Sequence, residues 1–233
     1  MKFDRILCDV PCSGDGTIRK NYDVWTKWNV ANGNNFHGIQ LRIAKRGLEM
    51  LKKDGILVYS TCSLNPIEDE AVIASLLNLS EGGAQLEDVS NVLPNLKYRK
   101  GLENWKVMTR EMVCVESIDS VQDKYKSQIR KSLFPPKNAH QLNLNRCLRV
   151  LPHLQNTGGF FVAVIRKTVD TLSWETSPQK EPLDLRQEEK PEDLNSERQS
   201  SNQRPRKKRR IFGYKEDPFI FLDQNEADWP KIK

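Results

Sequence analysis

The stretch FDRILCDVPCSG, residues 3–14, is a short apolar run that ends in turn residues. A run of this length and composition predicts a strand over Phe3–Val10 that is buried on both faces, as in a parallel sheet. Helically spaced apolar residues then predict a helix over about 37–53, ending at Lys52 and Lys53 with Gly55 as its stop. A second strand is predicted at 56–60. Strand, helix and strand in this order predict an α/β fold built on a βαβ unit.

Two cysteines follow these two strands. Cys12 comes directly after the first strand and Cys62 directly after the second, and Asp9 closes the first strand. Because neighbouring parallel strands lie about 4.8 Å apart and their carboxyl ends share one edge of the sheet, we expect the two thiols and the carboxylate to form one site.

Two thiols beside a carboxylate suit covalent chemistry on an electron-poor carbon. A thiolate is a soft nucleophile that adds to such a carbon and later leaves. C6 of cytosine is such a carbon, and addition there makes C5 able to accept a methyl group from a sulfonium donor. One cysteine suffices for the addition, so the second fits proton handling or release, and the carboxylate fits binding of the amine or ring nitrogen.

The other thiols are assigned no chemistry. We interpret Cys8, Cys114 and Cys147 as small buried hydrophobic residues. Five cysteines without regular spacing indicate neither a disulfide framework nor a zinc site, and a disulfide between Cys12 and Cys62, although geometrically possible, is not expected inside a cell. The three histidines are scattered, and no metal is expected.

Further elements are predicted along the first 168 residues. Asn65-Pro66-Ile67-Glu68 predicts a helix through about Leu79, with Asn65 as N-cap, proline at the first position and glutamate at the third. Gly158-Gly159 precedes a clear strand at 160–165. Two short strands are predicted near 105–108 and 112–116.

The chain changes character after residue 168. Residues 169–210 are rich in Ser, Glu, Gln, Pro and Lys and are predicted to be a disordered linker, and residues 211–233 resemble the start of a second domain. Six of the 37 basic residues fall within 204–210, and the remaining basic residues equal the 31 acidic residues in number. This cluster indicates nuclear import or nucleic-acid contact, with an incidental solvated charge run as the alternative. No run reaches the roughly 20 apolar residues of a membrane span.

Residues 1–168 resemble the Nop/Sun family of RNA cytosine C5-methyltransferases. DVPCSGDGT (9–17) resembles the family's fourth motif, STCSLNPIEDE (60–70) its sixth, and residues 149–163 its last conserved strand region. The resemblance implies S-adenosylmethionine as methyl donor, RNA as acceptor, and a half of a Rossmann-like methyltransferase sheet as the fold. By motif position, Cys62 is the nucleophile, Cys12 assists release of the methylated RNA, and Asp9 lies beside donor and cytosine. The tail at 212–219 points to the eukaryotic nuclear branch that modifies tRNA.

Family members carry a cofactor-binding half before the fourth motif. The resemblance therefore implies that this chain is a fragment with a partial catalytic domain at 1–168 and a truncated second domain at 211–233. We expect the strand at Phe3–Val10 to have an unpaired edge, and the chain to bind S-adenosylmethionine weakly or not at all.

Two alternatives remain open. The chain is a non-catalytic RNA-binding or interaction fragment, or it shares the chemistry of DNA cytosine methyltransferases, whose nucleophile sits in a Pro-Cys motif like Pro11-Cys12. Trp25, Trp28 and Trp105 are candidates for base stacking by residue type, although packing is the expected role of each.

Overall fold

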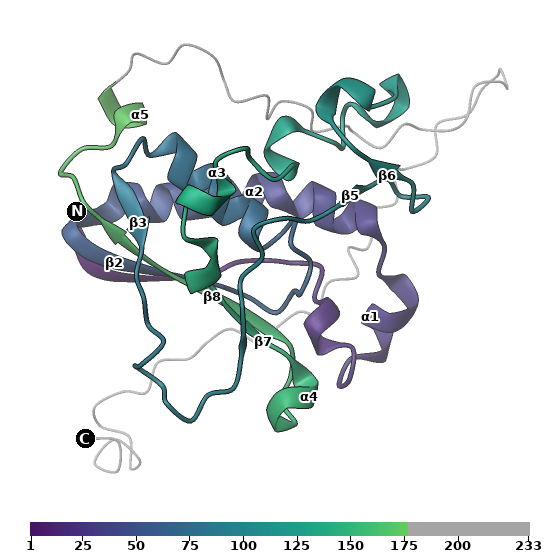
Figure 1. The fold of residues 1–233 in the computed structure, drawn as a ribbon, viewed down its shortest axis with the longest axis horizontal. Helices are drawn as coiled ribbons and strands as arrows, with labels where there is room; N and C mark the ends of the chain where they lie inside the picture. Colours follow the sequence, from purple (N-terminus) through teal and green to yellow (C-terminus); the bar gives the residue numbers. More distant parts are fainter. Residues whose placement is uncertain (177–233) are drawn as a thin grey trace, which may run out of the picture. The chain divides into compact units, whose positions relative to one another are not determined.

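The computed structural model describes residues 1–176, which form a mixed α/β fold around one sheet. The predicted linker beyond residue 176, its basic cluster and the predicted start of a second domain lie outside the described residues. The sheet has the order β1-β2-β8-β7-β4, and β3 also pairs with β8 (Figure 1). Its strands are β1 (Phe3–Asp9), β2 (Leu51–Thr61), β3 (Ala84–Leu86), β4 (Arg99–Lys100), β7 (Leu148–Val150) and β8 (Phe160–Lys167).

The predicted βαβ unit is confirmed. β1 and β2 are parallel, with Ile6 opposite Leu57 and Asp9 opposite Ser60, and α2 (Val30–Met50) connects them. β8 runs antiparallel to β2 on its other side. β1 is therefore at the end of the sheet order, as expected, and has a strand partner on one side among the described residues.

The prediction that β1 is buried on both faces is wrong. Cys8 is buried on the face toward α2, whereas Leu7 on the opposite face is 70% exposed. No described helix packs on that second face, so the short apolar run alternates between core and solvent instead of lying in a covered parallel sheet.

Helix α2 begins and ends earlier than the predicted 37–53. It starts at Val30, where the side chain of Asn29 accepts from Asn32 N, and ends at Met50. Lys52 and Lys53 lie in β2 rather than at the helix end, because Leu51 pairs with Phe3 and Lys52 bonds Asp4 across the strands.

Helix α3 (Glu70–Leu79) packs beside α2 over the sheet (Figure 1). It begins four residues after the predicted start, because residues 66–69 form turns rather than the first helical turn. Asn65 still caps this segment locally, since its Oδ1 accepts from Ile67 N at 3.2 Å.

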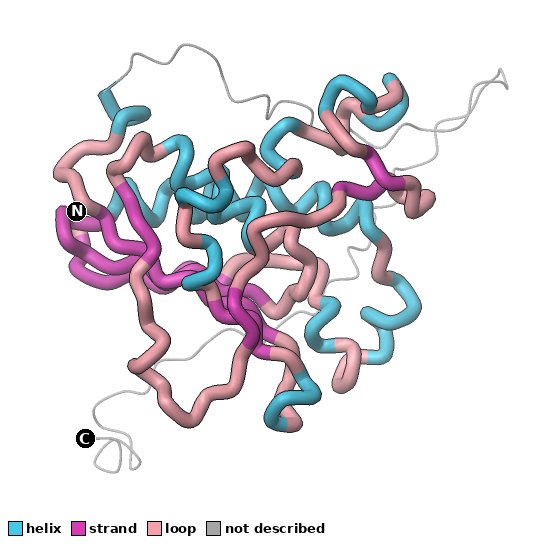
Figure 2. Tube along the Cα trace, viewed as in Figure 1, coloured by secondary structure: helices cyan, strands magenta, loops and turns pink. Residues whose placement is uncertain are grey.

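The segment from 87 to 147 is mostly loop with short 3-10 turns, as the tube in Figure 2 shows. Within it, β5 (Val107–Met108) and β6 (Cys114–Val115) pair as a small antiparallel sheet, which confirms the two predicted short strands. The short helix α1 (Tyr22–Lys27) follows the Cys12 loop, and α4 (Pro152–Gln155) precedes β8.

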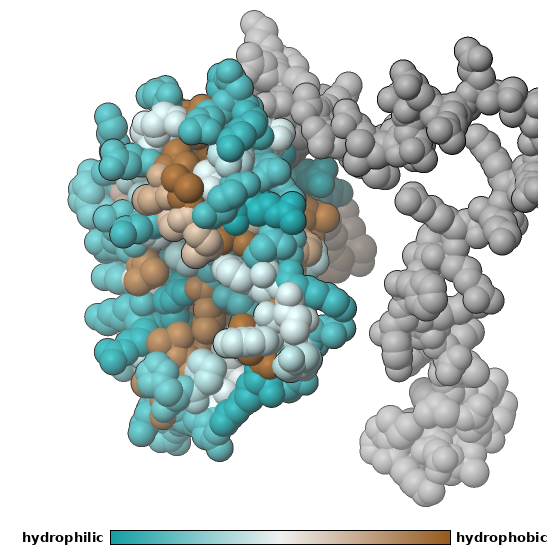
Figure 3. Space-filling model, turned by 90° about the vertical axis from the view of Figure 1, so that its right-hand side faces the viewer, coloured by the Kyte–Doolittle hydropathy of each residue, from teal (hydrophilic) through white to brown (hydrophobic). Residues whose placement is uncertain are grey.

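The main core lies between the sheet and the α2–α3 layer and extends under the loops. Its largest fully buried side chains include Tyr59, Phe161, Leu48 and Ile73. Residues 169–176, assigned above to the linker, contain α5 (Ser173–Thr176), and Leu172 before it is fully buried. On the face drawn in Figure 3, hydrophobic residues form separate patches within a largely hydrophilic surface.

Candidate functional site at the carboxyl ends of β1 and β2

The structure brings the two predicted thiols together. Cys12 follows β1 and Cys62 follows β2, and their sulfur atoms lie 3.3 Å apart. This separation exceeds the roughly 2.05 Å of a disulfide, so the pair is a thiol–thiol contact. Both cysteines are partly accessible to solvent. The juxtaposition predicted from the βαβ unit is therefore observed.

The contact between the two thiols shifts their pKa values in opposite directions. The hydrogen bond from Cys12 lowers the pKa of Cys62 from 9.0 to about 7, against the opposing effects of burial and of the charges on Asp9 and Asp15. The same hydrogen bond, together with burial, raises the pKa of Cys12. Near neutral pH, the Cys12 thiol therefore donates to a Cys62 sulfur that carries much of the negative charge.

Asp9 lies at the same edge of the sheet. Its exposed carboxylate accepts a hydrogen bond from Ser60 Oγ at 2.8 Å, and Ser60 is its partner in the β1–β2 register. Asp15, which sequence reasoning did not select, accepts from Leu64 N at 2.8 Å and so ties the Cys12 loop to the Cys62 loop.

Glu68 is a second residue that sequence reasoning missed. Its side chain is fully buried between the two cysteine loops. Oε1 accepts from Ser13 N at 2.7 Å and from Gln40 Nε2 at 3.1 Å, while Oε2 accepts from Ser13 Oγ at 2.5 Å and Ser63 Oγ at 2.9 Å. The sequence placed Glu68 in a helix cap, but its carboxylate turns instead toward the residues that follow both cysteines.

Glycines complete the join between these loops and β8. Gly16 N donates to Cys62 O at 2.9 Å, and Gly159 N donates to Gly16 O at 2.8 Å. A Cβ on Gly16 would lie 2.6 Å from Cys62 O and 2.7 Å from Gly159 O. The absence of a side chain at Gly16 is what allows three backbone segments to meet beside the thiols.

A buried ion pair holds the loop after Cys62. Arg149 Nη1 lies 2.7 Å from Glu70 and 3.5 Å from Asp69, and its Nη2 donates to Leu64 O in the loop after Cys62. Burial raises the pKa of Asp69 well above its ordinary value. The Asp69 carboxyl also accepts from Thr61 Oγ1 at 2.8 Å, so its position follows that of the strand end.

His37 on α2 fixes the other end of this loop. Its Nδ1 bonds Ile67 O at 2.8 Å, and a carbonyl can only accept, so Nδ1 carries the proton and Nε2 accepts from Ser132 Oγ at 2.9 Å. Burial lowers the pKa of His37 to about 4. The imidazole is therefore a neutral structural link rather than a proton-transfer group at neutral pH.

The other three thiols differ in their exposure to solvent. Cys8 and Cys147 are buried, as predicted, and burial raises the pKa of each. The prediction for Cys114 is wrong: it is exposed, because it lies on the outward side of the small β5–β6 hairpin, which covers no core with that face.

The three tryptophans considered as candidates for base stacking lie in different environments. Trp105 is buried and donates to Leu133 O at 2.7 Å, so it has the expected packing role. Trp28 donates to Ser13 Oγ at 3.0 Å, which links it to the Glu68 network. Trp25 is 67% exposed on α1.

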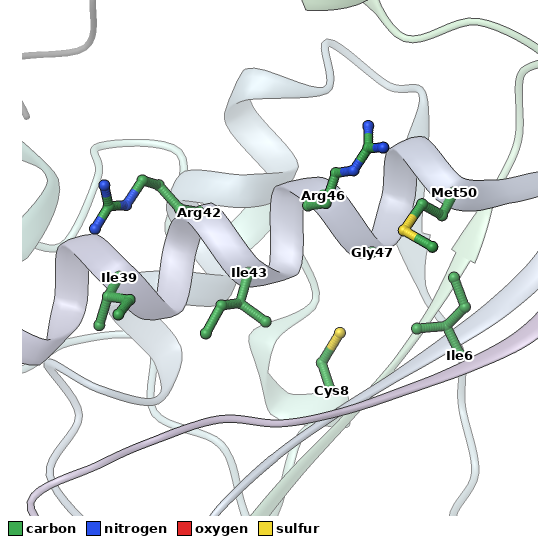
Figure 4. A pocket seen from close by; sticks show the side chains of 8 residues that line it. All are labelled: Ile6, Cys8, Ile39, Arg42, Ile43, Arg46, Gly47 and Met50. Atoms are coloured by element: carbon green, nitrogen blue, oxygen red, sulfur yellow. The ribbon is translucent and has the colours of Figure 1, made fainter.

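A concave region lies on the outer flank of β1. Ile6 and Cys8 of β1 point toward Ile39, Ile43 and Met50 of α2, and Arg42 and Arg46 extend from the same helix with their guanidinium groups away from β1 (Figure 4). These residues and Gly47 line a groove of about 500 Å³. It is apolar and separate from the thiol pair.

Within residues 1–176, no cluster of His, Cys, Asp or Glu has the arrangement of a metal site. In the same range, no helix is long and apolar enough to cross a bilayer.

A parallel βαβ unit with a thiol pair at its carboxyl edge defines an α/β protein with a candidate nucleophilic site. Residues 1–166 match the family model of the 16S rRNA methyltransferase RsmB/F. The chain belongs to this family.

Curated relatives extend the match. The chain is 46% identical over 246 residues to the tRNA (cytosine(34)-C(5))-methyltransferase of Drosophila melanogaster, which covers 100% of this chain and 33% of that protein. It is 41% identical over 230 residues to the multisite-specific tRNA:(cytosine-C(5))-methyltransferase of Saccharomyces cerevisiae, covering 97% of this chain and 32% of that one. The chain thus spans about a third of the length of these relatives.

Among solved structures, a methyltransferase homologue from Pyrococcus horikoshii matches with 31% identity and a TM-score of 0.44, covering 72% of this chain and 40% of that one.

Proposed function

We propose that this chain carries the covalent-catalysis part of an RNA cytosine-C5-methyltransferase that acts on tRNA. The observation that carries the proposal is the 3.3 Å contact between Cys12 and Cys62, with the pKa of Cys62 lowered to about 7. The names of the fly and yeast relatives support tRNA as the substrate class.

In the proposed reaction, the Cys62 thiolate adds to C6 of a cytosine that has been turned out of its stack. The sulfur electron pair forms the S–C6 bond, and the C5=C6 electron pair shifts to C5 and toward the ring nitrogen, where Asp9 holds the amine or ring nitrogen. S-adenosylmethionine, when bound, would supply an electrophilic methyl group for C5 and keep the electrons of the broken S–CH3 bond as a neutral thioether. Removal of the C5 proton by a base then restores the C5=C6 bond and expels the Cys62 thiolate.

Cys12 is assigned to the release step. Its thiol donates to the Cys62 sulfur and so stabilises the thiolate that must leave. The same hydrogen bond assists the attacking thiolate less, because a stabilised nucleophile is less reactive. Cys12 therefore fits the second half of the reaction better than the first.

Asp9 is the described residue that fits contact with the methyl donor. Its carboxylate is exposed at the end of β1 and can accept from a hydroxyl or amine of a bound molecule. Because we assign a single side chain of this chain to the donor, we expect the isolated chain to bind S-adenosylmethionine weakly or not at all. A micromolar dissociation constant measured by calorimetry would contradict this expectation.

Covalent trapping tests the function. The chain is incubated with tRNA containing 5-azacytidine, with the full-length Drosophila relative as positive control, and denaturation-resistant adducts are quantified. We expect an adduct with the wild-type chain and with Cys12→Ala, and none with Cys62→Ala. Loss of the adduct in Cys12→Ala but not in Cys62→Ala would favour the DNA-type mechanism.

A second candidate is an RNA-binding or interaction fragment with idle cysteines. The observation that favours it is that Asp9 is the one described side chain assigned to the methyl donor. It predicts no adduct while the full-length control reacts. A nuclear location is proposed from the basic cluster at 204–210, and a fluorescent fusion with and without these residues tests it.

A further inference from the structure

Glu68 is a buried carboxylate that the proposed chemistry does not use. It is fully buried, and each of its oxygen atoms accepts at least two hydrogen bonds. Burial of a carboxylate is costly unless its oxygens are satisfied in this way. The polar partners that the fold gathers around Glu68 therefore indicate a specific task for it.

The partners of Glu68 come from both cysteine loops. Ser13, directly after Cys12, donates through its backbone N–H and its hydroxyl, and Ser63, directly after Cys62, donates through its hydroxyl. The carboxylate thus joins the two residues that follow the thiols, which are 50 positions apart in the chain.

Two further contacts hold Glu68 in place, one through its carboxylate and one through its backbone carbonyl. Gln40 Nε2 of α2 donates to both Glu68 Oε1 at 3.1 Å and Pro11 O at 2.9 Å, so it also fixes the residue before Cys12. Tyr59 Oη donates to the Glu68 carbonyl at 2.6 Å. We call Glu68 and its bonds to Ser13 and Ser63 the clamp. Through Gln40 and Tyr59, the clamp is anchored in the helix layer and in β2 rather than in the loops that it joins.

We propose that Glu68 is a positioning residue that holds the Cys12 thiol against Cys62. The proposal rests on the proposed function, in which this contact prepares the Cys62 thiolate and assists its release. Without the clamp, the two loops keep the Asp15 and Gly16 links and the bonds of Ser60 to Val10 and Asp9 at the strand ends, and the thiol–thiol contact lengthens.

The test is the pH dependence of Cys62 alkylation by iodoacetamide, followed by mass spectrometry of the separated peptides. The exposed Cys114 serves as an internal reference. In the wild-type chain we expect a midpoint near pH 7 for Cys62. In Glu68→Gln we expect the midpoint to rise by about one pH unit, which reduces the alkylation rate at pH 7 about fivefold.

The direction of the shift separates positioning from simple charge. Removing a negative charge near the thiols would by itself lower their pKa values. A midpoint that falls or stays unchanged in Glu68→Gln would therefore overturn the proposal.

Asp69→Asn is the matched control, because Asp69 is the next residue and equally buried, but its carboxyl bonds Thr61 at the end of β2 and neither Ser13 nor Ser63, so it does not join the two cysteine loops. We expect it to leave the Cys62 midpoint unchanged, and a shift as large as that of Glu68→Gln would overturn the specific role of Glu68.

If Glu68→Gln fails to fold, as judged by circular dichroism, Ser13→Ala and Ser63→Ala replace it, since each removes one hydroxyl of the clamp. Each should raise the Cys62 midpoint by a smaller amount, and no shift in either would count against the proposal. These titrations need no RNA or methyl donor. The failure of the clamp is therefore distinguishable from the failure of the proposed function, which trapping alone tests.

Discussion

The carboxyl end of β1 and the outer flank of the same strand differ in how they are built. At the carboxyl end, Cys12 meets a second thiol among loops that are joined by backbone and carboxylate hydrogen bonds. On the flank, Cys8 lines an apolar groove, and Leu7 on the opposite face of β1 is exposed. Two cysteines four residues apart thus occupy opposite environments. Burial raises the pKa of the Cys8 thiol, whereas the Cys12 thiol meets Cys62 and lowers the pKa of that second thiol. The environment, and not the residue type, distinguishes the two cysteines.

The largest effect is expected from the buried ion pair below the site. Arg149→Leu leaves the Glu70 and Asp69 carboxylates without their cation and should lower the free energy of unfolding by about 3–5 kcal/mol. Urea unfolding measures it. The matched variant on the flank is Arg46→Leu, because Arg46 pairs with Glu49 at an exposed position and should cost less than about 1 kcal/mol. Equal losses of unfolding free energy in the two variants would contradict the proposed difference between the carboxyl end of β1 and its outer flank.

Glycine substitutions are expected to give the next largest loss in the free energy of unfolding. Gly16→Ala places a methyl group against two backbone carbonyls that cannot move aside, and we expect a loss of about 1–3 kcal/mol. Gly47→Ala on the flank meets side-chain atoms, which are Leu57 Cδ1 at 2.5 Å, Cys8 Sγ at 2.9 Å and Ile6 Cγ2 at 3.7 Å, and better helix propensity offsets part of its cost. Thermal unfolding of both variants compares them. A larger loss for Gly47→Ala would show that the flank is the more rigid region.

His37, which lies on the site-facing part of α2, is expected to make the free energy of unfolding depend on pH. Its pKa is about 4 in the folded chain against an ordinary 6.5, because burial disfavours the charged ring and Arg130 adds a smaller effect. Between these pH values the unfolded state binds more protons, so stability falls as the pH is lowered.

We expect His37 to account for a loss of about 2 kcal/mol between pH 7 and pH 5. His37→Gln should show a smaller loss over this range in urea unfolding, since glutamine does not titrate. The same loss in both proteins would assign the acid sensitivity to other groups.

The sequence was sufficient to predict the βαβ unit and the meeting of Cys12 with Cys62, because parallel strands joined by a helix must end at the same edge. It also predicted that β1 lies at the end of the sheet, which holds for the strand order of the described residues. It did not predict the antiparallel pairing of β8 with β2, which depends on residues about a hundred positions apart.

The role of Glu68 was hidden for a different reason. A glutamate three residues after Asn65 matches a helix cap, and local spacing cannot show that Ser13, 55 positions away, offers stronger partners. A carboxylate in the turn after a predicted site cysteine was the only signal. Cys114 was misassigned because residue type predicts burial, whereas the hairpin that carries it has an outward side.

The most direct test of the thiol pair is the titration of Cys62 in the wild-type chain and in Cys12→Ala. The hydrogen bond from Cys12 is the main cause of the lowered pKa, so the alkylation rate of Cys62 should rise through pH 7 in the wild type. In Cys12→Ala the midpoint should move toward 9. A wild-type midpoint near 9, or one that Cys12→Ala leaves unchanged, would contradict the account.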